Sequence, residues 1–325
     1  PIYSKLIFAD HFLSKEILKY YEDLFERCEK IFELNINLIF SEPIFIESKF
    51  NQSVSNLSET LILIYFGYSF NQDVSNLPRG LIHLSFGTNF NQDVSNLPQM
   101  LTYLSFGCYF NQKVSKLPSS LTHLIFGEFF NQDVSELPLN LTHIYFGTGF
   151  NRDISLLPEK LTHLILNESF NQDISKLPPT LTMIDFYCYL GRDTLKLPQT
   201  LTHLGFNGRF YQHFDIPLNI KYLNLNCNNS YIINSLPDSI IELQLNMHFN
   251  LQMDNLPTSI KKIIIHPYSN YDKDLNCLPQ FLEELHLNCN YTKRILNIPV
   301  NLKKLVCGEK YSHKNDFSMC IIENF

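Results

Sequence analysis

Tryptophan is absent from this 325-residue chain, glycine is scarce at 11 residues, and charged residues make up 18% of the total. An average soluble domain has about one quarter charged residues. Intrinsic disorder needs high charge and low hydrophobicity, so this chain, at 45% hydrophobic, is expected to fold. The net charge of −7 and pI near 5.9 lack the basic excess of nucleic-acid-binding proteins. We therefore expect no nucleic-acid partner.

Long apolar runs are also missing. No stretch of about 18 apolar residues occurs, so the sequence predicts no membrane-spanning helix and no membrane partner. The first residues, PIYSKLIFADHF, lack the apolar core and cleavage site of a secretory signal. The eight cysteines show no tight pairing. We expect reduced thiols in a cytoplasmic compartment.

Sequence motifs of catalysis are absent as well. There is no Gly-rich phosphate loop, no zinc-type cysteine pair, no nucleophile elbow and no HExxH. The side chains that could carry chemistry are copied along the chain, whereas catalytic groups tend to be unique. The sequence therefore predicts a protein that is not an enzyme, with no cofactor and no metal site.

What the chain does contain is an internal repeat with a period of about 20 residues. Phe-Asn-Gln or Phe-Asn-Arg begins at Phe50, Phe70, Phe90, Phe110, Phe130, Phe150 and Phe170. A Leu-Pro pair recurs at the same interval, with its proline at Pro78, Pro98, Pro118, Pro138, Pro158, Pro178 and Pro198. Leu-Pro or Ile-Pro pairs then continue at similar intervals, at Pro217, Pro237, Pro257, Pro279 and Pro299.

One copy, Leu121 to Asn140, defines repeat positions 1 to 20. Positions 1, 4, 6, 10, 14 and 17 are consistently apolar. Positions 4 and 6 alternate with variable positions 3 and 5, which is the period of a short, half-buried strand. Proline at position 18 favours an extended or turn-like return. The Phe side chains of positions 6 and 10 are expected to stack as internal spines.

A single copy cannot fold alone. Six buried apolar side chains contribute about 9–18 kcal/mol, whereas ordering the backbone of one copy costs about 20–40 kcal/mol in entropy. Copies must therefore stack into a solenoid with one parallel sheet and a single domain over residues 41–308. We predict fourteen strands, centred on Ile44, Ile64, Leu84, Leu104, Leu124, Ile144, Leu164, Ile184, Leu204, Leu223, Leu243, Ile263, Leu285 and Leu305.

Two polar columns follow from the same repeat. Asn at position 11 (Asn51, Asn71, Asn91, Asn111, Asn131, Asn151, Asn171) is expected to form a hydrogen-bonded ladder, because an amide offers two donors and an acceptor. Asp at position 13 (Asp73, Asp93, Asp133, Asp153, Asp173, Asp193) is interpreted as a solvated turn rather than a cation site.

The units FNQDVSNLPQMLTYLSFG and FNQDVSELPLNLTHIYFG closely resemble the FNIP repeat, a relative of the leucine-rich repeat known mainly from social amoebae and from large viruses that infect amoebae. The resemblance covers residues 41–308 and is strongest over about 50–210. It implies a leucine-rich-repeat-like solenoid with a curved parallel sheet on the concave face and an extended, turn-rich convex side. If the protein is viral, the expected compartment is the host cytoplasm.

Some FNIP-repeat proteins carry an N-terminal F-box, which recruits a cullin ubiquitin ligase through a Skp-type adaptor. Residues 14–33 form an amphipathic pattern of one helix, whereas an F-box needs about three. We therefore interpret residues 1–40 as a helical cap, with a degenerate F-box-like segment as the alternative. Residues 309–325 are expected to cap the other end.

The resemblance places strand positions 3 and 5 on the concave side, the default binding surface of this architecture. The candidate binding residues there are Tyr65, His83, Tyr103, His123, Ile125, His143, Tyr145, His163, Asp185 and His203. Parallel imidazoles about one strand spacing apart rarely converge on a metal, so a stacked ladder is expected. Charging of these histidines below about pH 6.5 is expected to weaken binding. Glu242, Lys262, Glu284 and Lys304 are expected to form cross-strand ion pairs.

These observations favour a module that binds another protein on its concave sheet. Two alternatives are a substrate-recognition subunit of a cullin-type ubiquitin ligase, acting through residues 1–40, and a structural or self-assembling component.

Overall fold

A computed structural model describes residues 44–45, 49–188, 196–207, 215–226 and 229–324. The chain divides into two compact units, which meet in sequence between Leu164 and Ile165. The prediction of a single domain over residues 41–308 stays a prediction. The predicted helical cap and F-box-like segment at 1–40 lie outside the described residues.

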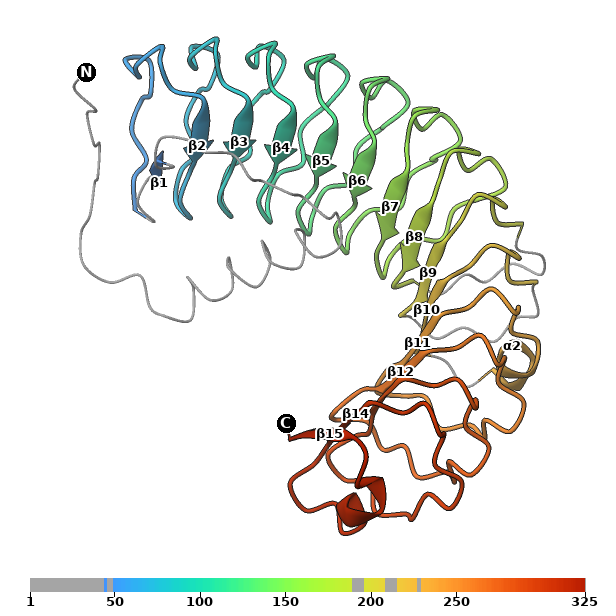
Figure 1. Ribbon diagram of the computed structural model, residues 1–325. Helices are drawn as coiled ribbons and strands as arrows, with labels where there is room; N and C mark the ends of the chain where they lie inside the picture. The colour runs from blue at the N-terminus through green and yellow to red at the C-terminus, as the bar shows by residue number, and fades with distance from the viewer. Residues whose placement is uncertain (1–43, 46–48, 189–195, 208–214, 227–228, 325) are drawn as a thin grey trace. The chain divides into compact units, whose positions relative to one another are not determined.

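Short parallel strands follow one another in chain order in the first unit (Figure 1). Each pairs in register with its counterpart in the next copy, as Leu104 does with Leu124. The strands are β1 (Ile44–Phe45), β2 (Leu63–Tyr65), β3 (His83–Ser85), β4 (Tyr103–Ser105), β5 (His123–Ile125) and β6 (His143–Tyr145). Strand β7 (His163–Leu166) crosses the boundary between the units.

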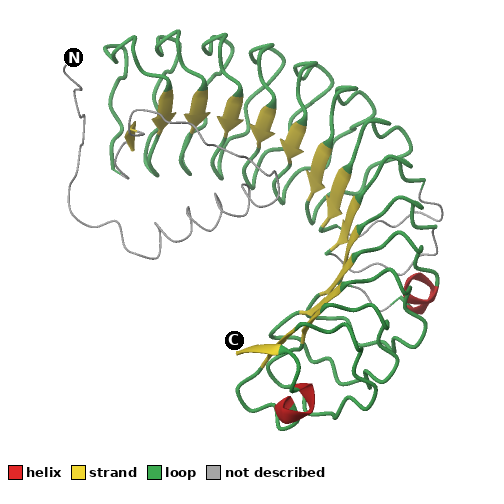
Figure 2. Ribbon diagram, viewed as in Figure 1, coloured by secondary structure: helices red, strands yellow, loops and turns green. Residues whose placement is uncertain are grey.

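The second unit repeats this arrangement. Its strands are β8 (Met183–Phe186), β9 (His203–Phe206), β10 (Tyr222–Leu225), β11 (Glu242–Leu245), β12 (Lys262–Ile265), β13 (Glu284–His286), β14 (Lys304–Cys307) and β15 (Ile321–Asn324). Apart from the short helix α2 (Ser230–Asn234) and a 3₁₀ helix at Lys314–Phe317, the described residues between these strands form loops and turns (Figure 2). All fourteen predicted strand centres lie in strands.

One strand was not predicted. Strand β15 pairs in parallel with β14, within the segment that we expected to act as a cap. Its four residues are exposed, and the Leu-Pro pair that marks the other repeats is missing there. Residues 309–324 therefore add a further strand to the sheet.

The Phe spines of the first unit are confirmed. Rings at position 6 stack on their neighbours at 5.5–5.8 Å, and rings at position 10 stack at 6.0–6.1 Å. Strands lie about 4.8 Å apart, so the spacing between copies widens with distance from the sheet. The sheet therefore forms the concave side of this unit.

The turn side is held by backbone and side-chain hydrogen bonds. The carbonyl of Pro118 accepts from Leu121 N–H at 3.2 Å, which closes the turn-like return that proline predicts. The predicted Asn ladder is confirmed: Asn91 Oδ1 accepts from the backbone N–H of Asn111 at 2.9 Å, and the bond recurs from Asn51 to Asn151. Five of the predicted turn aspartates accept from the backbone and hydroxyl of the serine that follows in the same turn (Asp73, Asp93, Asp133, Asp153, Asp173).

Candidate interaction face of the sheet

Side chains at strand positions 3 and 5 point away from the buried positions 4 and 6, and we call them the sheet face. The structure brings eight candidate residues together on the sheet face of the first unit: Tyr65, His83, Tyr103, His123, Ile125, His143, Tyr145 and His163. Asp185 and His203 lie on the sheet face of the second unit.

Aromatic rings on the first face stack on one another from strand to strand. His83 stacks on Tyr103 with ring centroids 4.0 Å apart. His123 stacks on His143 at 4.2 Å, and His143 on His163 at 4.1 Å. Tyr103 and His123 are farther apart, at 6.2 Å. This packing buries His83 and Tyr103 and leaves the other three histidines half-buried.

Threonine at position 2 fixes the orientation of the histidine that follows it. Thr122 Oγ1 donates to the backbone carbonyl of Thr102 at 3.0 Å, and it lies 2.8 Å from Nδ1 of His123. Because the single hydroxyl proton is already used, the imidazole must donate through Nδ1–H, which assigns the tautomer of the neutral ring. The same pair of bonds recurs at three further copies (Thr142–His143, Thr162–His163, Thr202–His203).

His83 departs from this pattern because Ile82 precedes it in place of threonine. Its Nε2 is buried without a hydrogen-bond partner. The role of threonine at position 2 was missed at the sequence level. The signal was the recurring Leu-Thr-His block, but the bond becomes evident only once neighbouring copies are in register.

Burial holds these histidines neutral. Desolvation, with repulsion from a histidine two strands away (His123 for His83, His163 for His123), lowers the pKa of His83 and of His123 to about 4. Desolvation with repulsion from both neighbours lowers the pKa of His143 to about 3. The expected charging of the face below about pH 6.5 is therefore wrong for these three side chains, because stacking removes the water that would solvate an imidazolium.

The sheet face of the second unit is more polar. His203 stacks on Tyr222 at 4.2 Å, and the predicted ion pairs are confirmed. Lys262 Nζ lies 3.9 Å from Glu242 and 3.5 Å from Glu284. Lys304 continues the row to Glu284 at 3.7 Å and to Glu323 at 2.8 Å.

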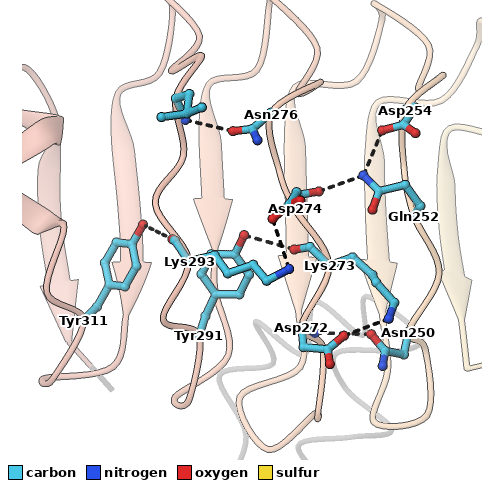
Figure 3. A network of polar contacts seen from close by, with 11 residues as sticks. Asn250, Gln252, Asp254, Asp272, Lys273, Asp274, Asn276, Tyr291, Lys293 and Tyr311 are labelled. Carbon is cyan, nitrogen blue, oxygen red and sulfur yellow. Dashed lines mark hydrogen bonds and ion pairs between the residues drawn. The ribbon is translucent and has the colours of Figure 1, made fainter.

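The turn side of the second unit carries a separate polar network (Figure 3). Lys293 Nζ lies 3.0 Å from Asp274, and Tyr291 Oη donates to the carbonyl of Lys273 at 3.1 Å. Each of these contacts joins residues of adjoining copies, so the network ties neighbouring turns together. Its members are partnered within the chain and are interpreted as structural.

Among the residues that the structure describes, no group of three or more His, Cys, Asp or Glu side chains is arranged to hold a metal ion. None of the helices there has the length and apolar character needed to cross a bilayer. The described cysteines are free thiols (Cys108, Cys188, Cys277, Cys289, Cys307, Cys320).

Comparison with known proteins identifies the repeat. The family model of the FNIP Repeat matches residues 73–109, 93–129, 110–147, 150–189 and 228–268. No curated protein matches the chain in sequence.

Several solved structures are similar to the chain. The crystal structure of CroV588, a novel circular LRR protein, is 34% identical with a TM-score of 0.68, and the match covers 87% of this chain and 46% of CroV588. The chain thus spans about half the length of this relative. An internalin, InlF from Listeria monocytogenes, matches with a TM-score of 0.45, 15% identity and 82% coverage of each chain. YopM from Yersinia enterocolitica matches with a TM-score of 0.45 and 18% identity, over 76% of this chain and 62% of YopM. The chain is therefore an FNIP-repeat protein with a leucine-rich-repeat-like solenoid fold.

Proposed function

We propose that the chain is a non-enzymatic interaction module that binds another protein on the sheet face of its first unit. The observation that carries the proposal is the continuous row of stacked rings at strand position 3, joined by Tyr65 and Tyr145 at position 5. Aromatic side chains supply large contact area and are enriched among the residues that dominate interface energy.

Rigidity supports the same proposal. The stacked rings and the Thr–His hydrogen bonds hold each side chain in one orientation before a partner arrives. Binding then orders few side chains, which reduces the entropy lost on association. Because His123 and His143 stay neutral down to about pH 4 and 3, which are their pKa values, a partner meets an uncharged aromatic surface at neutral pH.

A pull-down from a lysate of the native host tests the proposal. The tagged full chain is compared with a sheet-face variant that carries His143→Ala and Tyr145→Ala, both half-buried positions. We expect the variant to lose at least tenfold of the captured partner, since central aromatic residues contribute about 2 kcal/mol or more each.

The matched control changes aromatic residues elsewhere in the same unit. Tyr109 and Phe129 stack on each other at 5.3 Å and are about half exposed, outside the strands. The double variant Tyr109→Ala, Phe129→Ala should retain the partner. Undiminished capture by the folded sheet-face variant, or loss of capture in the control alone, would contradict the proposal.

A further inference from the structure

The row of position 5 side chains on the sheet face of the second unit is interrupted at Gly205, and we call this interruption the Gly205 notch. Position 5 carries a side chain on the flanking strands, Asp185 on β8 and Asn224 on β10, but Gly205 between them has none. The Asp185 carboxylate occupies the place of the missing side chain, because its Oδ1 lies 1.8 Å from the position that a Cβ on Gly205 would take. Glycine at this position is therefore what admits the carboxylate.

The Asp185 carboxylate has no compensating donor. Neither oxygen accepts a hydrogen bond or faces a cation among the described residues. Burial alone raises the pKa of Asp185 to about 6. Its neighbour at position 5 on the other side, Ile165, is fully buried and apolar. A carboxylate held in this way would be stabilised by any donor that enters the notch.

Two further polar atoms near Gly205 have no hydrogen-bond partner among the residues that the structure describes. Asn224, in register with Gly205, has a buried Oδ1 with no donor. The adjacent Gln244 cannot supply one, because its Nε2 donates to Glu242 at 2.7 Å. Asn207 has a buried, unpaired Nδ2 that lies 3.3 Å from the Cβ site of Gly205, while its Oδ1 accepts from Asn246 at 2.7 Å.

We propose that the Gly205 notch is a binding site for a basic side chain, lysine or arginine, of a protein that lies on the sheet face. The cationic group donates to the Asp185 carboxylate, which carries the uncompensated charge at the notch. This deepens the proposed function, on which it rests, by assigning the second unit a charged contact of its own in addition to the aromatic row of the first.

The chemistry of the notch selects this ligand. The charged group at the notch is an acceptor without a donor, so a cation rich in N–H donors satisfies it and an anion is repelled. A metal ion would find one carboxylate, and no set of three metal-ligating side chains is present among the described residues. Low solvation around Asp185 strengthens the pairing relative to an ion pair in open solvent.

The test uses the full chain and N-acetyl-arginine methylamide as the probe, with N-acetyl-lysine methylamide in parallel. Binding is followed by ¹⁵N NMR at the Gly205 amide and at the Asn207 side-chain amide. We expect saturable shifts at both groups with at least one probe, and at least fivefold weaker binding in Asp185→Asn. Gly205→Ala, whose Cβ would displace the carboxylate, should also abolish the shifts.

Three controls make the outcome decisive. N-acetyl-citrulline methylamide, a neutral analogue of the arginine probe, should bind at least fivefold more weakly. Asp238→Asn removes the same charge at an exposed turn of the same unit and should bind like the wild-type chain. Calcium chloride alone should leave Gly205 unshifted.

Equal binding of the arginine and citrulline probes, unchanged binding in a folded Asp185→Asn, or saturable shifts with calcium would each overturn the proposal. The readout needs no protein partner, so its failure is distinct from failure of the pull-down on the first unit.

Discussion

At the scale of single residues, the stacked histidines make stability depend on pH. The folded pKa values of His83 and His123 (about 4) and of His143 (about 3) lie below the ordinary value of 6.5. Below about pH 6.5 the unfolded chain binds more protons at these sites. The free energy of unfolding should therefore fall as pH drops from 6.5 toward 4 and 3, and this contribution is complete above 6.5.

Urea unfolding between pH 7 and 4 measures this dependence, and His143→Gln isolates one site. Asp185 acts in the opposite direction, because its raised pKa of about 6 makes the folded chain bind the extra proton between about pH 6 and 3.8. Because Asp185 is present in both chains, its contribution to the slope cancels when the wild-type chain is compared with His143→Gln. We expect the slope of the wild-type chain to exceed that of the variant by up to about one proton. Identical slopes would show that the pKa of His143 is the same in the folded and the unfolded chain, which would contradict the prediction.

A row of tyrosines in the second unit offers a matched test of buried hydroxyl groups. Tyr291 and Tyr311 donate to the carbonyls of Lys273 and Lys293 at 3.1 and 3.0 Å, whereas the hydroxyl of the buried Tyr271 has no partner. We expect Tyr291→Phe and Tyr311→Phe each to lower the free energy of unfolding by about 1 kcal/mol.

Tyr271→Phe should leave the free energy of unfolding unchanged or raise it, because it removes an unsatisfied polar group. The three variants differ by one oxygen atom each and are compared by urea unfolding. A loss of about 1 kcal/mol or more in Tyr271→Phe would show that its hydroxyl is bonded in solution.

At the scale of the repeat element, glycine at position 7 accompanies the short strands β2 to β6. In β2 to β5 the position 6 N–H donates forward to the next strand, as Phe106 does to Ile125 at 2.9 Å, and β2 to β6 have three residues each. In β9, where Asn207 stands at this position, its N–H donates back to Phe186 at 2.7 Å and the strand has four residues. The rule does not extend to the last copies, because β13 has three residues before Asn288 and β14 has four before Gly308.

Gly107→Ala should be strongly destabilising. A Cβ there would lie 2.0 Å from the carbonyl oxygen of Gly87, a backbone atom that cannot move without shifting the copy. We expect a loss of about 3 kcal/mol or more, at the upper end for overpacked sites. Gly80→Ala is the control, since its nearest neighbour would be Glu59 O at 3.6 Å. It should be neutral or stabilise by up to about 1 kcal/mol, as thermal unfolding would show.

The repeat elements also show what a sequence can and cannot predict. The strand centres, the Phe spines and the Asn ladder could be predicted from periodicity, because most copies carry the same type of residue at the same repeat position. Strand β15 was missed because it lacks Leu-Pro, and Tyr271 was not expected to leave a hydroxyl unpaired. The repeat copy that contains Tyr271 is longer than the others. The buried Ser269 therefore stands at position 10, where other copies have an aromatic residue, and the aromatic ring comes two residues later, at Tyr271. The Gly205 notch depends on which residues fall side by side on three strands, information that no single copy contains.

At the scale of the whole molecule, a stack in which each copy contacts its neighbours should open locally. Stability in such arrays is a sum of intrinsic and nearest-neighbour terms, so damage to one interface need not spread. Asn91 is a suitable place to test this, because its Oδ1 accepts both from Asn111 N–H at 2.9 Å and from Gln112 at 3.1 Å.

Asn91→Ala leaves the Asn111 N–H without its acceptor and should lower stability by about 1–3 kcal/mol. Hydrogen exchange followed by mass spectrometry should show faster exchange in peptides from residues 81–130 and unchanged exchange in 241–324. Asn219→Ala, which removes an exposed amide bond to the Gln199 carbonyl, is the control and should alter exchange little. Uniformly faster exchange along the whole chain in Asn91→Ala would mean that the copies unfold as one cooperative block, and the nearest-neighbour description would then fail.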